Sequence, residues 1–358
     1  MLFTLSVNDI HGKMTDLELI GLYEIAELAG VGPSAVANWR KRARDFPAPV
    51  AELRSGPVFR SSQIRAWLRR RRVPMTTVIA TINLKGGVGK STTTVAVAET
   101  LSAVFHKKVL VIDLDPQTNA TTMLIGEEKW KKLNNEGLTL AQLFKDALES
   151  DGRARTFDIE KTIQKGVSNV ADVQNLDLLP SSLDLIDVQD RLAGMSSGRF
   201  YAENPTDILR RATRSIIEMY DLVLVDCPPN LGIITLNGLR ISNGYIIPTI
   251  PDILSTYGIP QIVKRVGQFS DTIGENIDPL GILISKYRAQ STTHTNVLRE
   301  MKRKADAPLF ETIIPENDKA ADAADYAPVS TLRQKWGYQG QYDRYVALTK
   351  ELMERAGV

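Results

Sequence analysis

The sequence predicts an α/β fold with a parallel sheet, preceded by a small, basic, mostly helical module. The runs VLVI at 109–112 and LVLV at 222–225 are uniformly hydrophobic, which is typical of strands buried on both faces of a parallel sheet. A glycine loop at 86–89 separates a β-rich run from a helical pattern. Charge also divides the chain, because residues 1–75 carry 12 Lys and Arg against 7 Asp and Glu, whereas the remainder carries 32 against 35. The basic surplus indicates a polyanionic partner for the first part.

Composition narrows the class of protein. The chain has 358 residues, of which 43% are hydrophobic and 24% charged, as in soluble globular proteins. Its single cysteine, Cys227, excludes an intramolecular disulfide framework and argues against a cysteine-rich metal site. The sequence shows no apolar run of about 18 residues and no signal-peptide pattern, so we expect a cytoplasmic protein.

Residues 22–41, LYEIAELAGVGPSAVANWRK, match a helix-turn-helix pattern. Ala26 is small where two helices would cross, Gly30 suits the turn, and Pro33 suits the first turn of the second helix. The second helix would present side chains that can contact base edges or phosphates, namely Ser34, Asn38, Arg40, Lys41 and Arg42. The alternative is an ordinary helical hairpin with a solvated basic face.

The next stretch, residues 46–72, predicts a short hairpin with its turn at 55–57 and then a helix from Ser61 or Ser62. Ile64, Trp67 and Leu68 would face inward. Together the two stretches resemble small winged helix-turn-helix modules of the MerR and excisionase type. We therefore expect a DNA-binding domain over 21–73, an arm or extra helix over 1–20, and a linker near Val73–Thr77 before a domain at 77–358.

The stretch NLKGGVGKST, at 83–92, has the context of a phosphate-binding loop. It follows the β-rich run TTVIATIN and precedes a helical pattern. We expect backbone N–H groups to bind phosphates, Lys90 to bridge the β- and γ-phosphates, and Ser91 to hold Mg²⁺. The nucleotide-binding residues would be Lys85, Gly86, Gly87, Val88, Gly89, Lys90, Ser91 and Thr92. One lysine suffices for such a loop, so Lys85 is a second that needs an explanation.

Carboxylates follow two of the apolar runs. Asp113 and Asp115 end one and Asp226 ends the other. The carboxyl ends of parallel strands are where ligands bind in open α/β sheets. A single aspartate there could be only a helix cap, but three beside a phosphate loop indicate a Mg²⁺–nucleotide site.

The motifs KGGVGKST, VLVIDLDPQ and LVLVDCPP resemble the deviant Walker A, switch I and Walker B motifs of the ParA/MinD ATPases, and LDLLPSSLDL and ETIIPENDKAADAADYAPV are similar to further ParA stretches. The resemblance covers residues 77–358 and implies an α/β, parallel-sheet P-loop ATPase domain. It also implies that Lys85 contacts the nucleotide of a partner subunit and that Asp115 orients the attacking water. Lys85, Lys90 and Asp115 are thus the expected catalytic residues. By the same resemblance, Asp113 and Asp226 support Mg²⁺ directly or through water, and Pro315 lies near the adenine.

The family resemblance implies a slow, ATP- and Mg²⁺-dependent DNA-partition ATPase that is nucleoid-associated. A basic helix-turn-helix before the ATPase is similar to the larger ParA proteins encoded on plasmids, so we expect plasmid partition. Its ATP-bound sandwich homodimer would bind DNA non-specifically, and a ParB-like centromere-binding protein would stimulate hydrolysis and release. The candidates for non-specific DNA contact are Lys286, Arg288, Arg299, Lys302 and Arg303, for which an exposed charged helix is the alternative. The N-terminal domain would bind a specific operator for autoregulation.

Two alternatives stay open: a ParA-like ATPase that positions another cargo, and a MinD-like ATPase that acts at a membrane. The membrane alternative needs a basic amphipathic tail, but the charge of QYDRYVALTKELMERAGV is balanced. That segment therefore predicts a docking helix, and we expect no membrane partner. A nitrogenase-type iron–sulfur ATPase is excluded, because one cysteine per chain cannot supply four thiolates even across a dimer.

Overall fold

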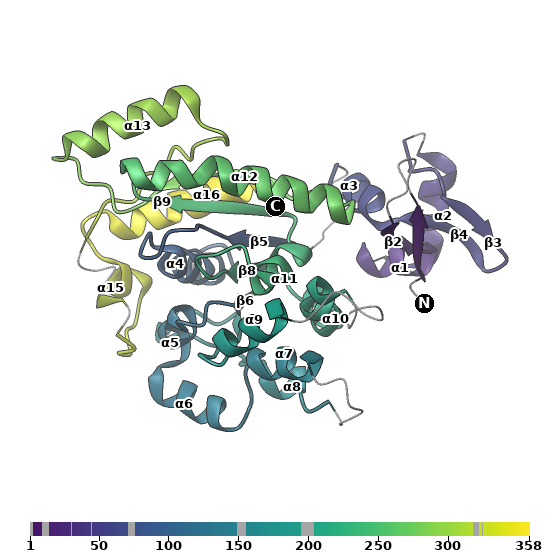
Figure 1. The fold of residues 1–358 in the computed structure, drawn as a ribbon, viewed down its shortest axis with the longest axis horizontal. Helices are drawn as coiled ribbons and strands as arrows, with labels where there is room; N and C mark the ends of the chain where they lie inside the picture. The colour runs from purple at the N-terminus through teal and green to yellow at the C-terminus, as the bar shows by residue number, and fades with distance from the viewer. Residues whose placement is uncertain are drawn as a thin grey trace.

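The chain forms a smaller part before residue 71 and a larger α/β part from residue 76 onward, side by side in Figure 1. The structure is a computed structural model, and it describes residues 3–8, 14–29, 31–43, 45–70, 76–148, 155–194, 204–317, 322–323 and 325–358. The expected linker positions 71–75 lie outside these ranges, as does Gly30.

The smaller part packs three helices on a four-stranded sheet. Helices α1 (Leu22–Leu28) and α2 (Pro33–Arg42) lie where the sequence predicted two helices, with Pro33 in the first turn of α2. Strands β3 (Ala51–Leu53) and β4 (Gly56–Arg60) form the hairpin, and α3 (Ser61–Arg70) follows. The core contains the fully buried side chains of Ile25, Val36, Phe59, Ile64, Trp67 and Leu68.

Two details of this part differ from expectation. We expected an arm or a helix over residues 1–20, but the residues described there, 3–8 and 14–20, form the antiparallel strands β1 (Phe3–Asn8) and β2 (Met14–Ile20), and β2 also pairs with β4. The reason is visible in FTLSVN, where apolar and polar residues alternate with the period of a strand. The hairpin turn lies at residues 54–55, so Gly56 and Pro57 already belong to β4.

The larger part is built on a six-stranded parallel sheet in the order β10-β9-β5-β8-β6-β7. The strands are β5 (Thr77–Thr81), β6 (Val109–Asp113), β7 (Leu176–Leu179), β8 (Leu222–Asp226), β9 (Gly244–Thr249) and β10 (Asp278–Ile284). All residues of β5, β6 and β8 are buried, as their largely apolar sequences predicted. Asp226 is in register with Thr81 on one side and with Asp113 on the other, so three strand ends meet at one edge.

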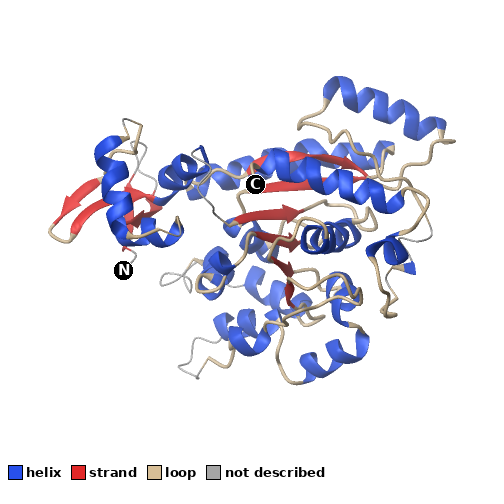
Figure 2. Cartoon of the chain, turned by 180° about the vertical axis from the view of Figure 1, so that it is seen from behind, coloured by secondary structure: helices blue, strands red, loops and turns tan. Residues whose placement is uncertain are grey.

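Helices cover both faces of this sheet (Figure 2). One face packs against α4 (Lys90–Ala103), α5 (Asn119–Ile125), α15 (Leu332–Trp336) and α16 (Gln341–Ala356). The other packs against α7 (Leu140–Leu148), α9 (Leu185–Gly194), α10 (Ile208–Thr213), α11 (Ile233–Ile241), α12 (Ile253–Ile273) and α13 (Thr292–Lys304). Short elements complete the chain: α6 (Glu127–Asn135), α8 (Ile159–Thr162), η2 (Pro205–Asp207) and η3 (Ile217–Met219).

The C-terminal helix α16 docks on the body of the protein. Tyr345, Leu348 and Leu352 are buried in the core cluster that also contains the apolar side chains of α4. The predicted docking helix is therefore confirmed, and the apolar side of this tail is occupied by the protein itself. Within the ranges given above, none of the helices combines the length and the apolar character needed to cross a lipid bilayer.

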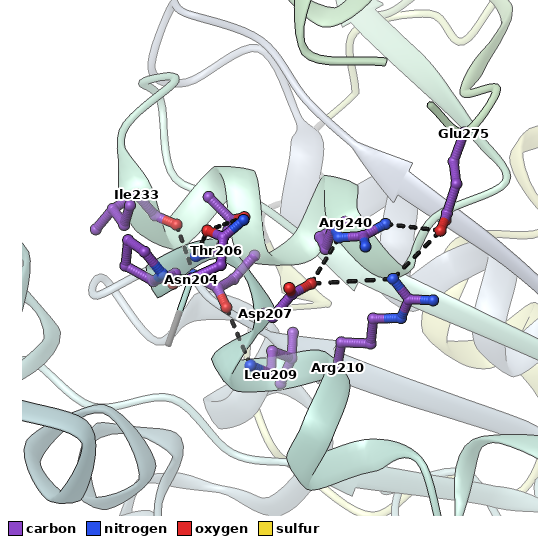
Figure 3. A network of polar contacts seen from close by, with 10 residues as sticks. Asn204, Thr206, Asp207, Leu209, Arg210, Ile233, Arg240 and Glu275 are labelled. Carbon is purple, nitrogen blue, oxygen red and sulfur yellow. Dashed lines mark hydrogen bonds and ion pairs between the residues drawn. The ribbon is translucent and has the colours of Figure 1, made fainter. Parts of the chain in front are cut away.

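Two ionic networks, each around a buried cationic side chain, connect segments that are distant in the sequence. In the first, Arg240 of α11 pairs through Nε with Asp207 (2.6 Å) and through a terminal nitrogen with Glu275 (2.9 Å), as Figure 3 shows. In the second, Lys335 Nζ of α15 lies 2.7 Å from Glu99 Oε1 of α4, and Trp336 Nε1 donates to Glu99 Oε2 (2.8 Å). The second network fixes α15 to the helix that follows the glycine loop.

Candidate functional site

The glycine loop connects β5 to α4 at the carboxyl edge of the sheet. Gly87 and Gly89 have φ values of +74° and +84°, a region that L side chains rarely adopt, so glycine is required at both. Ser285, which follows β10, donates its hydroxyl to the Val88 carbonyl (2.7 Å) and anchors the loop. The first N–H groups of α4 have no acceptor within the helix, which makes this terminus suited to a phosphate.

Lys90, the first residue of α4, lies at this edge with a side chain that is almost fully buried. Its positive charge lowers the pKa values of Asp115 and Asp226, although burial outweighs that effect for both. The structure therefore brings the predicted lysine and carboxylates together in one buried group.

Asp226 is the residue of this group that most directly indicates a bound cation. Both of its carboxylate oxygens are buried, and neither has a hydrogen-bond partner among the described residues. Burial raises its pKa well above the ordinary value, and the charge of Asp113 adds to that effect. A buried carboxylate without partners is unfavourable unless a cation compensates it, and a carboxylate oxygen is a ligand that Mg²⁺ prefers.

Asp113 is held differently. Its Oδ2 accepts hydrogen bonds from the Thr121 hydroxyl (2.6 Å) and N–H (2.8 Å), and its Oδ1 accepts from the Asp115 N–H (3.0 Å). Burial raises its pKa to about 7, against the effect of the Thr121 hydrogen bonds. Since its oxygens are already engaged, Asp113 fits a cation through water better than by direct contact.

The described side chains do not form a cage for a metal ion by themselves. No group of three or more His, Cys, Asp or Glu is arranged to hold one among the residues that the structure covers. This arrangement fits Mg²⁺, which is commonly bound by one or two carboxylates together with substrate phosphates and water. The Ser91 hydroxyl lies close enough to Asp226 to lower the pKa of that carboxyl, although the two groups do not meet the geometry of a hydrogen bond.

Asp115 sits in the turn after β6 and is nearly fully buried. Its Oδ1 accepts the Gln117 N–H (3.0 Å), and its carbonyl accepts the Ser181 hydroxyl (2.7 Å). Burial raises its pKa, opposed by the Gln117 hydrogen bond and the charge of Lys90. A carboxylate in this setting is suited to accept a hydrogen bond from a water molecule.

Lys85 points to a different element from Lys90. Its Nζ lies 2.7 Å from Asp252 Oδ2 and donates to the Ser255 hydroxyl at 3.1 Å. Asp252 is also the N-cap of α12, because its Oδ1 accepts the Ser255 N–H. With its side chain 39% exposed, Lys85 occupies the rim of the site and is held there by the start of α12.

Pro315 lies near the same edge of the sheet. It forms a bridge with Tyr287, two residues after the Ser285 that anchors the loop. This position is compatible with a base-binding role, which stays a prediction.

The residues predicted to contact DNA form two separate sets. On α2, Ser34, Asn38, Arg40 and Lys41 are exposed, Arg40 pairs with Glu52 of β3, and the Arg42 side chain lies outside the described residues. In the larger part, Arg299, Lys302 and Arg303 are exposed on α13, which projects beyond α12 in Figure 1. Lys286 is half-buried, and Arg288 is engaged by Glu316.

Sequence reasoning missed four residues of the site region. Ser181, Asp252 and Ser285 each follow the carboxyl end of a strand of the same sheet, so the rule that identified the aspartates could have found them. Thr121 has no such signal, because it lies inside α5 and its role depends on which carboxylate meets that helix.

Comparisons with known proteins agree on one family. Residues 76–278 match the model of an AAA domain. The chain is 30% identical to the sporulation initiation inhibitor protein Soj of Bacillus subtilis, over 70% of this chain and 88% of that protein. It is similar to the structure of cobyrinic acid a,c-diamide synthase from Mycobacterium smegmatis with a bound ATP analogue and magnesium (26% identity, 70% and 91% of the two chains, TM-score 0.55). A plasmid partition protein from Borrelia burgdorferi shares the fold (22% identity, 78% and 99% of the chains, TM-score 0.57).

Proposed function

Because this chain belongs to the AAA-domain family of ParA/MinD-type P-loop ATPases, we propose that it is a DNA-partition ATPase that uses ATP and Mg²⁺. The observation that carries the proposal is the unpartnered carboxylate of Asp226, beside Lys90 and the phosphate loop. This group of opposite charges suits a nucleotide phosphate chain with its cation.

Each residue of the site then has a role. The loop N–H groups and Lys90 bind the phosphates, Ser91 and Asp226 hold Mg²⁺, and Asp113 supports the ion through water. Asp115 orients the attacking water, and Pro315 lies against the base. The bound ion neutralises phosphate charge, while the chain itself supplies the fixed geometry.

Lys85 is proposed to act in a homodimer, where it contacts the phosphates of the partner subunit. Within its own chain Lys85 contacts Asp252 and Ser255, and these contacts support the proposal that Lys85 exchanges partners when the dimer forms. ATP would thus promote dimerisation, and a ParB-like centromere-binding protein would stimulate a slow basal hydrolysis that separates the dimer.

DNA would be bound at two places. The smaller part is proposed to be a winged helix-turn-helix that binds operator DNA through α2, with the β3–β4 hairpin as its wing; the order of its helices and strands and its basic surplus support this assignment. Non-specific binding is assigned to α13, whose Arg299, Lys302 and Arg303 can neutralise phosphates. A nucleoid-associated location follows from that binding.

The two lysines give the first test. Lys85→Ala should abolish ATP-dependent dimerisation while the monomer still binds nucleotide, because a charge-assisted contact worth roughly 10- to 150-fold in an equilibrium is lost only in the dimer. Lys90→Ala should weaken nucleotide binding itself. Sedimentation with ATP and Mg²⁺, together with a nucleotide-binding assay, separates the two, and Lys131→Ala, which removes another exposed ion-paired lysine, is the control. A Lys85→Ala protein that still dimerises with ATP would refute the cross-subunit role.

A variant of Asp252 tests the cross-subunit role of Lys85 by releasing that lysine instead of removing it. Asp252→Asn keeps an N-cap for α12 but removes the charge that holds Lys85. Since partly exposed ion pairs contribute about 0.2–1 kcal/mol, the variant should dimerise with ATP at a protein concentration lower by roughly 1.4- to 5-fold. Weaker dimerisation would show that Asp252 acts within the dimer rather than against it.

A further inference from the structure

Ser181 is a fully buried serine, two residues after β7, and all three of its polar groups are engaged. Its hydroxyl donates to the Asp115 carbonyl (2.7 Å). Its N–H donates to the Thr121 hydroxyl (3.0 Å), and its carbonyl accepts the Trp130 indole N–H (3.1 Å). The PSS segment of the sequence therefore reaches the loop after β6, which carries Asp115.

The Thr121 hydroxyl continues this chain of hydrogen bonds. It accepts the N–H of Ser181 with a lone pair and donates its own hydrogen to Asp113, at 2.6 Å from Oδ2. Asp113 in turn accepts the N–H of Asp115 through its other oxygen (3.0 Å). Asp115 is thus fixed at its N–H by Asp113 and at its carbonyl by Ser181.

The backbone at the end of this loop is strained. Thr118 has a φ of +57°, which is unusual for a β-branched side chain, and its N–H donates to the same Asp115 carbonyl (2.9 Å). Such a conformation persists only where the surroundings determine it, and it is often found where a side chain must be held for function. The Ser181 hydroxyl is one of the groups that determine it.

We infer that Ser181 is a positioning residue for ATP hydrolysis, which holds the Asp115 loop directly and Asp113 through Thr121. The inference rests on the proposed role of Asp115 as the residue that orients the attacking water. Ser181 acts through these carboxylates and does not itself contact the nucleotide or the attacking water. Its effect is on the placement of a carboxylate whose displacement by an ångström lowers a rate strongly.

The next residue, Ser182, provides a matched control. It is equally buried and its hydroxyl also makes hydrogen bonds, but it donates to Asn134 Oδ1 (2.6 Å) and accepts the Asp184 N–H (3.1 Å). These bonds fix the turn between β7 and α9 and the end of α6. Both alanine variants therefore lose a buried serine hydroxyl, but only Ser181→Ala removes a hydrogen bond to the Asp115 loop.

The test compares Ser181→Ala and Ser182→Ala in the full-length protein by thermal unfolding, by equilibrium binding of a fluorescent ATP analogue, and by kcat and KM for phosphate release with Mg²⁺ and ATP. We expect Ser181→Ala to lower kcat by roughly 10- to 100-fold with less than about a twofold change in nucleotide affinity. Ser182→Ala should keep kcat within about twofold of the parent even where it lowers thermal stability by a similar amount. Equal kcat values for the two variants would overturn the inference.

Thr121 supplies a second, independent comparison. Thr121→Val keeps the volume and loses the hydroxyl, whereas Thr121→Ser keeps the hydroxyl and loses a methyl group. If the hydroxyl positions Asp113, Thr121→Ser retains the higher kcat. If only packing matters, Thr121→Val retains the higher kcat, and the positioning role of the Thr121 hydroxyl is refuted.

Asp115→Ala, measured alongside, separates this inference from the function on which it rests. An inactive Asp115→Ala with a fully active Ser181→Ala refutes only the positioning role. A fully active Asp115→Ala refutes the role of Asp115 and this inference with it.

Discussion

At the scale of single residues, several charged side chains are buried close together at the carboxyl edge of the sheet, which is unfavourable for folding. The carboxylate of Asp226 makes no hydrogen bond among the described residues, burial raises the pKa of Asp113 to about 7, and Lys90 is buried beside them. In the absence of a ligand these charges oppose folding, and a bound cation with phosphates would reverse the sign of that contribution. Such local conflict with stability is expected where a site has been shaped for binding.

Asp226→Asn should therefore stabilise the nucleotide-free protein and remove its response to ATP and Mg²⁺. An acid with a raised folded-state pKa binds more protons when folded, so the free energy of unfolding falls as pH rises above the ordinary value of 3.8. In Asp226→Asn the free energy of unfolding should fall less as pH rises. Near neutral pH it should exceed that of the parent by about 1–3 kcal/mol. Thermal unfolding at several pH values, with and without ATP and Mg²⁺, measures both effects.

The control for this experiment is Asp221→Asn, at the exposed amino end of the same polypeptide stretch. It should leave the response to ATP and Mg²⁺ intact. If Asp226→Asn is instead less stable than the parent without ligand and keeps a full ATP response, then Asp226 does not hold the cation.

At the scale of elements, the Glu99–Lys335 pair connects α4 to α15. Both side chains are essentially inaccessible to solvent. The Ser168 hydroxyl donates to Glu99 (2.6 Å), and the Asn169 side-chain oxygen accepts from Lys335 (2.7 Å). Breaking a buried pair leaves one charge uncompensated, which is more costly than replacing both partners. The pair thus makes the position of α15 specific relative to the helix that starts at the phosphate loop.

Lys335→Met should lower the free energy of unfolding by about 3–5 kcal/mol, because it leaves the Glu99 carboxylate buried without its cation. Adding Glu99→Gln should recover a large share of that loss, since the second change removes the charge. Chemical denaturation of the two single variants and the double variant gives the coupling energy. Purely additive losses would mean that the two side chains stabilise the fold independently.

At the scale of the whole molecule, the two parts make few strong polar contacts among the described residues. The ion pair between Arg65 of α3 and Glu218 of η3 spans 3.9 Å at a partly exposed position, so its contribution is small. The phosphate loop, the aspartates and Lys85 all belong to the larger part. The smaller part carries the exposed residues of α2.

A truncated protein that begins at Met75 should therefore hydrolyse ATP like the full chain and lose its operator footprint. The full-length double variant Arg40→Ala/Lys41→Ala should weaken the same footprint without loss of the N-terminal fold, because both side chains are exposed. Footprinting on the DNA upstream of the gene, alongside phosphate release, measures both properties. An unchanged footprint from the truncated protein would refute the assignment of operator binding to residues 21–73.

The sequence by itself determined the features that depend on local patterns. Apolar runs identified β6 and β8, a β-rich run identified β5, and the glycine loop between a strand and a helix predicted the phosphate site. The strand-end rule placed Asp113 and Asp226 at one edge, which the register of β6 and β8 confirms. The strand pair at residues 3–20 was readable by the same means, from its alternation, but was not predicted.

Only the tertiary structure decided which of these groups meet. The partners of Lys85 lie 167 and 170 residues away along the chain, and Ser181 lies 66 residues from Asp115. Those contacts depend on the order β10-β9-β5-β8-β6-β7, in which β9 brings Asp252 to the loop and β7 brings Ser181 to the end of β6. Spacing along the chain carries no information on such pairs, because hydrogen bonds and ion pairs act over a few ångströms in space and the sheet order sets those distances.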